Sequence, residues 1–537
     1  MVYVEKKEEF KTNGGIPVKK LYTPEDIADI NYQRDIGFPG EPPFTRGLYP
    51  EMYRSKLWSI RQLSGRNTPE DTNELFKYEY LHGETGFSVA FDTPTESGID
   101  SDDPRADADV GVGGVPTDSI KDIEVMFEGL PIDKVSTSLV LGTLSTCQVS
   151  AMYFAMAEKR GIDPKKLGGT GGTDMISDQV CMHHIDQIAP QPQLRLCVDL
   201  IEWACKYAPR WLAVNFDSYN HRESGITAAQ ELATLFTPVI GYTEEILRRG
   251  RVTIDECAPC YAYTMAWDID FFEEIAKLRA ARRMLYKIMK ERFGAKDPRS
   301  WRFRVHVQTA GSTHTLQQPL NNVVRVAYEV LAAALGGVQS LHANSYDEAV
   351  CLPTEESVLL ALRTQQVAQL ETNITNVVDP LGGSYYIEWL TNEVEKRAWQ
   401  YLEEIERAGG LVKAIESGWL YTEFTKAMVE HQMKIESGER KIVGVNCFQG
   451  NPEPFPGRIF RPNPKAGEIQ SGKLRKLRQE RDNRAVEKAL DRIRRDTESD
   501  VNVMPAVMDA VKSYCTVGEI CNVWRNIYGI WKLPIVR

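Results

Sequence analysis

The sequence predicts an α/β protein whose main part is a closed (β/α)8 TIM barrel, with an N-terminal wrapping segment and a helical C-terminal linker region. Between about residues 70 and 390, short apolar runs alternate with helix-length amphipathic runs, which is typical of parallel strands joined by helical crossovers. Roughly eight such units fit into this length. No glycine-rich dinucleotide fingerprint follows a first strand, so the alternative, an open doubly wound sheet, is disfavoured.

We expect three parts along the chain: a wrapping segment at 1–65, the barrel at 66–400 and the linker region at 401–537. The N-terminal stretch FPGEPPFTRGLYPEMY contains four prolines. Proline removes a backbone donor and disfavours regular structure. This stretch is therefore expected to wrap around a domain instead of forming its core.

Within the barrel region, the predicted strands are GFSVAFD, VSTSLVL, WLAVNFD, RFRVHVQ and VQSLHA, and the predicted helices are SAMYFAMAEKRG, LRLCVDLIEWACKYA, AAQELATLFTPVIGYTEEILRRG and DFFEEIAKLRAARRMLYKIMKERFG. Three strands turn abruptly polar where they end, in NFDSYNHRESG, VHVQTAG and QSLHANSYDEA. In a barrel, polar residues at the carboxyl ends of strands face the active site. One such segment alone would be read as a helix cap or loop; three together favour a site.

The composition changes after about residue 440. CFQGNPEPFPGRIFRPNPKAGE contains five prolines and is typical of a linker. IQSGKLRKLRQERDNRAVEKALDRIRRDTE is charged and helical, and its mixed signs favour a solvated or subunit-facing helix over a phosphate-binding one. NVMPAVMDAVKSYCTVGEICNVWRNIYG is amphipathic and also predicted to be helical.

The composition limits the classes of function. The 537 residues are 42% hydrophobic, and the formal net charge of -11 argues against nucleic acid or an anionic membrane as the main partner. No apolar run reaches the length of about 18 residues that a membrane span needs, and the N-terminus lacks the apolar core of a signal peptide. Ten cysteines without a secretory context indicate reduced thiols and a cytoplasmic location.

Single motifs point to chemistry only weakly. Cys257 and Cys260 form a Cys-x-x-Cys, but no second pair follows at zinc spacing, so two ordinary thiols are favoured. Cys181, His183 and His184 offer a possible metal site, although adjacent helical histidines point about 100° apart. No nucleophile elbow, P-loop or zinc-protease motif is present. The residues alone predict a barrel enzyme with a polar, histidine-containing mouth.

Long motifs add a resemblance. PPFTRGLYPEMY, SVAFDTPTESGIDSDDPRADADVGVGGVPTDS, VHVQTAGSTHTLQQPLNNVVRVA, GGVQSLHANSYDEA, DPLGGSYYIEWLT, IVGVN and YCTVGEICNVWRNIYG resemble the adenosylcobalamin-dependent acyl-CoA mutases, the methylmalonyl-CoA mutase family, over roughly residues 20–537. The resemblance implies a barrel that threads the CoA chain along its axis. It also implies a radical carbon-skeleton rearrangement in which the CoA-thioester carbonyl migrates.

The resemblance also implies a cofactor and a partner. A cobalamin domain of this family carries a D-x-H-x-x-G loop, and this chain has none. The implied arrangement is a large subunit that pairs with a separate small cobalamin-binding subunit, as a heterotetramer or larger. That partner would cap the barrel mouth and keep water from the reacting carbon.

The resemblance assigns site residues by position. His306, Gln308 and Gln339 match positions near substrate and cofactor, and Gln339 is taken as the functional residue of a cofactor-facing strand end. Tyr49, Met52, Ser59 and Arg61 match CoA-contacting positions, and Ser88 and Thr170 match the lining of the acyl pocket. The carbonyl-binding histidine aligns with Asn220, and a one-residue shift restores His221, which is the preferred donor.

Several positions depart from the family pattern. Leu63, Gly172 and Ser55 stand where methylmalonyl-CoA mutases have tyrosine, glutamine and phenylalanine, so side-chain volume is lost. Met182 stands at the position of the carboxylate-binding arginine and cannot form its bidentate pair. His183 or His184 is the candidate replacement. Cys260 and Ala262 replace a family arginine and serine, and Ala90 lacks the aspartate of the hydroxyisobutyryl-CoA mutases.

The lost volume leads to a hypothesis about the substrate: a bulkier 2-substituted malonyl-CoA or succinyl-CoA, such as the aryl substrates of (2-aminobenzyl)malonyl-CoA mutases. The alternatives are a methylmalonyl-CoA mutase large subunit, a non-catalytic CoA-ester-binding homologue and a metal-dependent barrel hydrolase.

Overall fold

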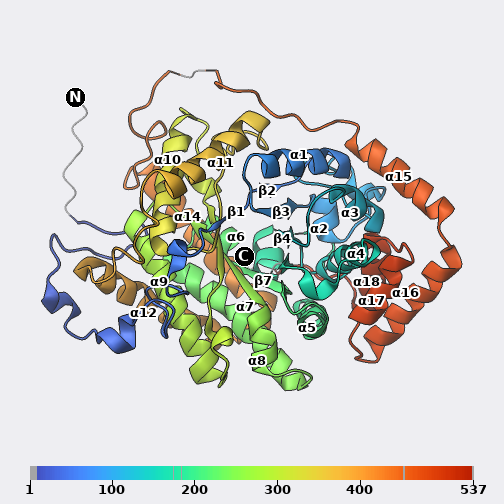
Figure 1. Cartoon of the computed structure of the whole chain (residues 1–537), viewed down its shortest axis with the longest axis horizontal. Coiled ribbons are helices and arrows are strands. Elements are labelled where there is room, and N and C mark those ends of the chain that lie inside the picture. Colours follow the sequence, from blue (N-terminus) through green and yellow to red (C-terminus); the bar gives the residue numbers. More distant parts are fainter. Residues whose placement is uncertain (1–8, 173, 183, 452–453, 535–537) are drawn as a thin grey trace.

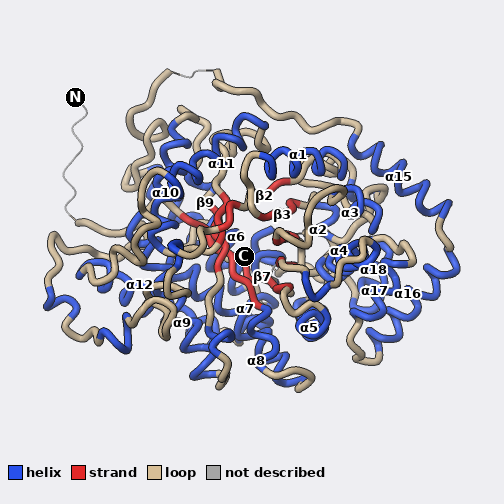
Figure 2. Tube along the Cα trace, viewed as in Figure 1, coloured by secondary structure: helices blue, strands red, loops and turns tan. Residues whose placement is uncertain are grey.

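The structure is a computed structural model that describes residues 9–172, 174–182, 184–451 and 454–534. Its strands are β1 (Ser59–Ile60), β2 (Leu63–Ser64), β3 (Gly86–Ala90), β4 (Ser136–Val140), β5 (Gly169–Gly171), β6 (Trp211–Leu212), β7 (Val214–Asp217), β8 (Tyr261–Trp267), β9 (Val305–Thr309) and β10 (Ser340–His342). They pair in parallel as two five-stranded sheets, in the orders β2-β3-β4-β5-β6 and β1-β10-β9-β8-β7. Figure 2 shows these strands at the centre of the molecule, surrounded by helices.

The two sheets belong to one barrel because, at both edges, the last strand of one sheet and the first strand of the other are two pieces of the same broken strand. Only Arg61 and Gln62 separate β1 from β2, and a single residue separates β6 from β7. The Ile60 carbonyl accepts a hydrogen bond from Thr85 N–H on one side, while Arg61 N–H donates to the Leu341 carbonyl on the other. Eight strand positions therefore follow one another around the barrel. The predicted (β/α)8 fold is confirmed, with a ladder interrupted at the two breaks.

Helices cover the outside of the barrel. They are α1 (Pro69–Leu81), α2 (Thr93–Ser97), α3 (Ile120–Met126), α4 (Thr146–Lys159), α5 (Pro190–Tyr207), α6 (Tyr219–Glu223), α7 (Ala228–Arg249), α8 (Ile254–Cys257), α9 (Phe271–Lys287), α10 (Asn321–Gly336) and α11 (Glu355–Leu370). Helices α4, α5, α7 and α9 occupy the stretches predicted from periodicity. Capping fixes their ends: α7 begins where Thr227 accepts from Gln230 N–H and ends at Gly250, with a φ of 65°.

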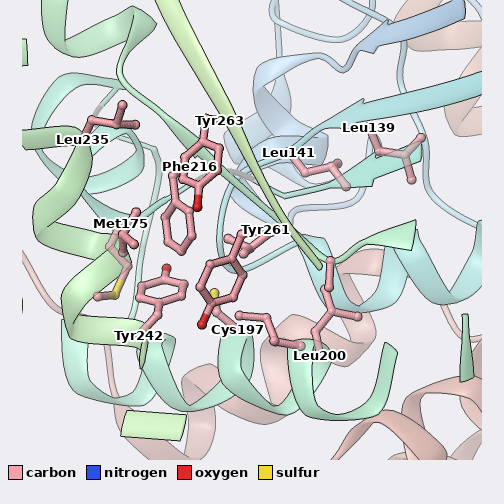
Figure 3. Close-up of a cluster of buried hydrophobic side chains, with 14 of the residues drawn as sticks. Leu139, Leu141, Met175, Cys197, Leu200, Phe216, Leu235, Tyr242, Tyr261 and Tyr263 are labelled. Atoms are coloured by element: carbon pink, nitrogen blue, oxygen red, sulfur yellow. The ribbon is translucent and has the colours of Figure 1, made fainter. Parts of the chain in front are cut away.

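Aromatic residues fill the space between the β7–β8 part of the barrel and its helices. Phe216 on β7 lies 5.4 Å from Tyr242 on α7 and 5.1 Å from Tyr261 on β8, measured between ring centroids. Figure 3 shows these rings together with Tyr263 in one buried cluster. These side chains alternate with the inward-facing residues of the same strands, so the cluster fixes which side chains face the barrel axis.

The C-terminal region is helical, as expected. It comprises α12 (Tyr385–Arg407), α13 (Gly410–Glu416), α14 (Trp419–Glu436), α15 (Ala466–Glu480), α16 (Asn483–Glu498), α17 (Met504–Lys512) and α18 (Val517–Tyr528). Helix α12 packs on α7 and α9, and α17 packs on α4. Figure 1 shows α15–α18 gathered along one side of the barrel. The charged stretch is two helices, because Asp482 accepts from the N–H groups of Arg484 and Ala485 and so caps a new start.

The first barrel strand differs from the expected domain boundary. Ser59–Ile60 and Leu63–Ser64 form strand segments within the part of the chain that was expected to wrap around the barrel. The segment before them does run over the outside: Asn13 N–H donates to Asp270 at the start of α9. Among the helices of the described ranges, none is long and apolar enough to cross a membrane.

Candidate active site

Alternate residues of each strand face the barrel axis, and most of these residues are small or polar. In the strand register these residues follow one another around the barrel in two rows. The first row is Leu63, Ser88, Ser138, Thr170 and Leu212, and the second is Ser59, Ser340, His306 and Thr264. Inward residues on several strands retain solvent-exposed surface, including Ser59, Leu63, Ala90, Ser136, Val140 and His306. The interior of an ordinary TIM barrel is packed with Val, Leu and Ile. This interior is polar and partly accessible instead.

Arg61 places a guanidinium inside the barrel. Its side chain donates to Ser136 Oγ, while Nε has no hydrogen-bond partner among the described residues. Burial lowers the pKa of Arg61 to about 10, with Glu84 acting in the opposite direction. Gly86 provides the space, because a Cβ there would lie 2.9 Å from Arg61 Nε. The guanidinium is still protonated at neutral pH and can receive an anionic or strongly polar ligand group.

Two histidines face the same interior and are uncharged. His306 Nδ1 lies 2.8 Å from Ser340 Oγ, and burial, together with nearby Arg61 and His342, lowers the pKa of His306 well below its usual value. Burial likewise lowers the pKa of His342 to about 4. His342 Nδ1 accepts a hydrogen bond of 2.7 Å from Leu63 N–H. Arg61 therefore supplies positive charge at neutral pH, while both histidines act as neutral hydrogen-bonding groups.

The carboxyl ends of β9 and β10 hold a rigid pair of amides. Gln308 Nε2 donates to Asn344 Oδ1 over 3.1 Å, and Asn344 Nδ2 donates to the Thr309 carbonyl over 2.8 Å. Both side chains are almost completely buried. The structure thus places Gln308 at the barrel mouth, where TIM-barrel active sites lie.

Gln339 lies at the other end of the barrel. It precedes β10, and its amide accepts from Val305 N–H over 3.1 Å and donates to the Gly337 carbonyl over 2.9 Å. The expectation that Gln339 ends a cofactor-facing strand therefore differs from the structure, because the strand begins immediately after it. Within the same stretch, His342 and Asn344 are the residues toward the carboxyl end of the strand.

The structure separates the two candidates for the carbonyl donor. Asn220, on α6, is partly exposed, and its Nδ2 lies 3.4 Å from Met182 Sδ. His221 is fully buried: Nδ1 lies 3.1 Å from Thr234 Oγ1, and the ring lies 5.7 Å from that of Phe424. Asn220 and Met182 thus meet at the surface of the mouth, while the preferred donor His221 points into the packing between helices.

His184 is held in a buried charged cluster. Its Nδ1 contacts Asp178 Oδ1, and its Nε2 lies 3.0 Å from Glu96 Oε2. Burial favours the neutral ring, but the two carboxylates outweigh this effect and raise the pKa of His184 to about 10. Both ring nitrogens are engaged, so the expectation that His184 could bind a substrate carboxylate is not supported by its geometry. His183, the other candidate, lies outside the described residues.

The residues assigned to the acyl pocket lie along one side of the barrel. Leu63 pairs with Ser88 in the strand register, and Thr170 Oγ1 donates to Ser138 Oγ over 2.7 Å. Gly172 follows β5 with a φ of 68°, and a Cβ there would lie 2.5 Å from Thr146 Oγ1. Gly172 therefore occupies a left-handed backbone conformation that residues with a side chain rarely adopt.

The proposed CoA contacts lie near the amino ends of the strands. Tyr49 is exposed, with the Arg302 guanidinium 5.8 Å from its ring centroid. Met52 is buried with Phe44 and Leu48. Ser55 donates to the Met52 carbonyl, and Ser59 begins β1 at the level of Ser340. The structure brings these residues to one end of the barrel, and Met182 and Asn220 to the other.

The remaining candidates occupy ordinary positions. Cys257 and Cys260 are buried free thiols, with pKa values that burial raises to about 12 and about 11. Among the residues that the structure describes, no group of three or more His, Cys, Asp or Glu side chains is arranged to hold a metal ion.

Sequence reasoning missed three residues that shape the interior: Gly86, His342 and Asn344. Gly86 opens the space for Arg61, and His342 and Asn344 connect neighbouring strands. A glycine in a strand, such as Gly86, and a histidine near an asparagine, such as His342 and Asn344, do not indicate a site by themselves. Their role is recognised only when the strand register shows which side chains they face.

A barrel lined by polar, partly accessible residues, with amides at its mouth, is typical of an enzyme. The sequence model of methylmalonyl-CoA mutase matches residues 11–530. The chain belongs to the methylmalonyl-CoA mutase family, and it is an isomerase, an adenosylcobalamin-dependent acyl-CoA mutase.

Curated relatives match nearly the whole chain. It is 42% identical over 530 residues to the 2-hydroxyisobutanoyl-CoA mutase large subunit of Aquincola tertiaricarbonis, covering 98% of this chain and 93% of the relative. It is 38% identical over 520 residues to the methylmalonyl-CoA mutase of Cereibacter sphaeroides, covering 97% and 72%. It is 36% identical over 519 residues to human mitochondrial methylmalonyl-CoA mutase, covering 96% and 68%.

Proposed function

We propose that this chain is the large, substrate-binding subunit of a two-subunit acyl-CoA mutase that acts on a 2-substituted malonyl-CoA or succinyl-CoA bulkier than methylmalonyl-CoA, such as an aryl derivative. The observation that carries the substrate assignment is the small acyl-pocket wall: Leu63 and Gly172 stand where the family pattern has tyrosine and glutamine, so side-chain volume is lost there. Met182 and Asn220 stand where that pattern has a carboxylate-binding arginine, so the carboxylate of the acyl group meets a thioether and a neutral amide.

The residues of the chain divide the work along the barrel axis. Arg61 and the hydroxyl-bearing residues Ser59 and Ser136 supply polar contacts for a CoA arm inside the barrel. Asn220 donates a hydrogen bond to the thioester carbonyl, in place of the buried His221. His306 and Gln308, each fixed by a neighbouring side chain, hold the acyl group in position without contributing charge.

The mouth fits contact with the adenosylcobalamin that the family uses, because Gln308, Asn344 and Asn220 bring amides to it. None of the eight histidines lies in a D-x-H-x-x-G loop, so in this proposal a separate small subunit would hold the cofactor. When bound, adenosylcobalamin supplies the homolytic chemistry that starts the rearrangement. The assembly is a heterotetramer or larger, in the cytoplasm.

One alternative is a 2-hydroxyisobutanoyl-CoA mutase, the activity for which the 42% identical relative is named. That branch places an aspartate for the substrate hydroxyl at the position of Ala90. Ala90 ends β3 with a partly exposed methyl group and offers no acceptor. This favours an acyl group without a hydroxyl there.

The test combines the chain with the small cobalamin-binding subunit from the same organism and adenosylcobalamin. Methylmalonyl-CoA, 2-hydroxyisobutyryl-CoA and aryl-substituted malonyl-CoA are then compared, with isomeric products separated by retention time and identified by mass. We expect the highest kcat/KM for an aryl substrate. Equal or faster turnover of methylmalonyl-CoA would overturn the substrate assignment, and no turnover of any thioester would favour a non-catalytic homologue.

A further inference from the structure

A second cavity lies beside the mouth, between the loop that follows β5 and the C-terminal tail. Its volume is about 460 Å³, within the range of small-molecule sites. On one side it is lined by Gln179, His184 and Ile185, and on the other by Tyr421, Trp531 and Leu533. Trp531 N–H donates to the Gln187 carbonyl over 2.8 Å, which fixes the tail against the loop. Three parts of the chain that are distant in sequence therefore build this cavity together.

One buried polar atom in the wall of the cavity lacks a partner among the described residues. Gln179 is 3% exposed, and its Nε2 donates to the Ile188 carbonyl over 3.2 Å. Its Oε1 is buried and accepts no hydrogen bond from any described residue. A buried amide oxygen without a donor costs free energy unless a ligand or water completes it. Other polar groups of this wall have partners: His184 contacts Asp178 and Glu96, Asp186 accepts from Arg105, and Gln187 accepts from Gln193.

The cavity is close to the acyl end of the proposed substrate. Gln179 and Met182 belong to the same π-helix, Ser177–Met182, and Met182 contacts Asn220 on α6. π-helical turns are rare and are frequent at functional sites. A group that extends from the acyl carbon past Met182 therefore reaches the cavity within about one helical turn.

We propose that this cavity is a binding subsite for an aromatic group that carries one N–H or O–H donor, with Gln179 Oε1 as the acceptor and Tyr421 and Trp531 as the aromatic walls. Aromatic rings pack favourably against such walls, and the buried acceptor of Gln179 favours a ligand that carries a donor. This inference rests on the proposed function, since it identifies where a bulky acyl substituent is held and which chemistry it carries.

The experiment measures direct binding to the full-length chain, without cofactor or thioester. Aniline and toluene have nearly the same size and shape, and only aniline donates an N–H. We expect aniline to bind about tenfold more tightly, as measured by ligand-observed NMR and quenching of tryptophan fluorescence. Gln179→Leu should remove the preference while toluene binding stays the same, and Trp531→Ala should weaken both ligands.

Gln179→Met serves as a second variant without an amide acceptor, in case leucine disturbs the fold, and a thermal melt of each variant verifies folding. Equal binding of aniline and toluene to the wild type, or a preference that persists in both Gln179 variants, would overturn the subsite and leave only a water site. Catalysis separates the two proposals. If the enzyme converts aryl thioesters and its preference among them is unchanged in the Gln179 variants, the subsite alone is refuted. If the chain binds aniline selectively but no aryl thioester is converted, the substrate assignment alone is refuted.

Discussion

His184 Nε2 lies 3.0 Å from Glu96 Oε2, and this contact joins two loops at the barrel mouth. Glu96 lies on α2, which follows β3, and His184 belongs to the loop that follows β5. The second partner, Asp178, also accepts from Thr143, which follows β4. One imidazolium therefore ties together the carboxyl ends of three neighbouring strands, next to Met182.

Replacing His184 should destabilise the protein. His184→Gln leaves two buried carboxylates without their cation, so the free energy of unfolding should fall by about 3 kcal/mol or more. Chemical denaturation monitored by circular dichroism measures the change. The double variant His184→Gln, Glu96→Gln should recover part of the loss because one of the carboxylates is removed. A double variant as unstable as the sum of the two single ones would contradict the contact.

The same cluster predicts a dependence of stability on pH. The pKa of His184 is about 10 in the folded protein, above its ordinary value of 6.5. Its stabilisation is therefore fully present below pH 6.5 and is lost as the pH rises toward 10, by at most about 1.4 kcal/mol per pH unit. Melting curves at pH 6, 7.5 and 9 should show this decline in the wild type. The His184→Gln variant should show a smaller slope.

Arg61 and Gly86 should act as a pair. Arg61→Gln should raise KM for the CoA thioester by about tenfold or more, because a charged donor inside the barrel is lost. Gly86→Ala should raise KM in the same direction, since its Cβ would lie 2.9 Å from Arg61 Nε. Arg66→Gln is the control and should leave KM unchanged. The Arg66 guanidinium packs over Phe460, 5.6 Å from its ring centroid, and not beside Gly86 or Ser136. Steady-state kinetics of the two-subunit enzyme decides; a Gly86→Ala variant with wild-type KM would refute the coupling.

Asn220 and His221 should have opposite effects. Asn220→Ala should lower kcat on the order of 100-fold by removing a donor at the thioester carbonyl, with an unchanged melting temperature. His221→Ala should instead lower the free energy of unfolding by about 2 kcal/mol, because it leaves a cavity in a fully buried site. Measuring kcat and thermal stability for both variants separates the roles. The assignment fails if Asn220→Ala keeps full activity.

Met182→Arg should shift the enzyme toward small dicarboxylic substrates. Met182 is 36% exposed, so a guanidinium fits at this position without burial. We expect methylmalonyl-CoA turnover to rise at least about tenfold over the wild type, since the charged pair with the substrate carboxylate is restored. Met182→Leu is the matched control and should bring no gain. Formation of succinyl-CoA, separated by chromatography, provides the readout.

The predictable parts of the fold are those with a local pattern. GFSVAFD and WLAVNFD form strands where apolar residues alternate or cluster, and α7 has both of its caps in the sequence. By contrast, β5 is only Gly169–Gly171, and two glycines in three residues give no apolar signal. The broken strand around Arg61 likewise gives little apolar signal, since its residues are mostly polar.

The site was predictable where a single residue decides its chemistry and unpredictable where contacts are distant. The methionine at position 182, where the resemblance implies an arginine, is read directly from the sequence. The partners of His184 are not: Glu96 lies 88 residues away, and only the fold brings the two together. Gln339 lies at the amino end of β10 because the strand begins at Ser340. Short polar runs define strand boundaries poorly, so the sequence does not show at which end of the barrel Gln339 lies.

Gly172 also limits how the acyl pocket of this chain could be redesigned. With a φ of 68° and Thr146 Oγ1 2.5 Å from an added Cβ, a side chain at this position would be strained and would collide with Thr146. An engineered variant with a larger residue here would therefore need a smaller residue at Thr146 as well. The turn after β5 thus keeps this part of the wall free of side-chain atoms.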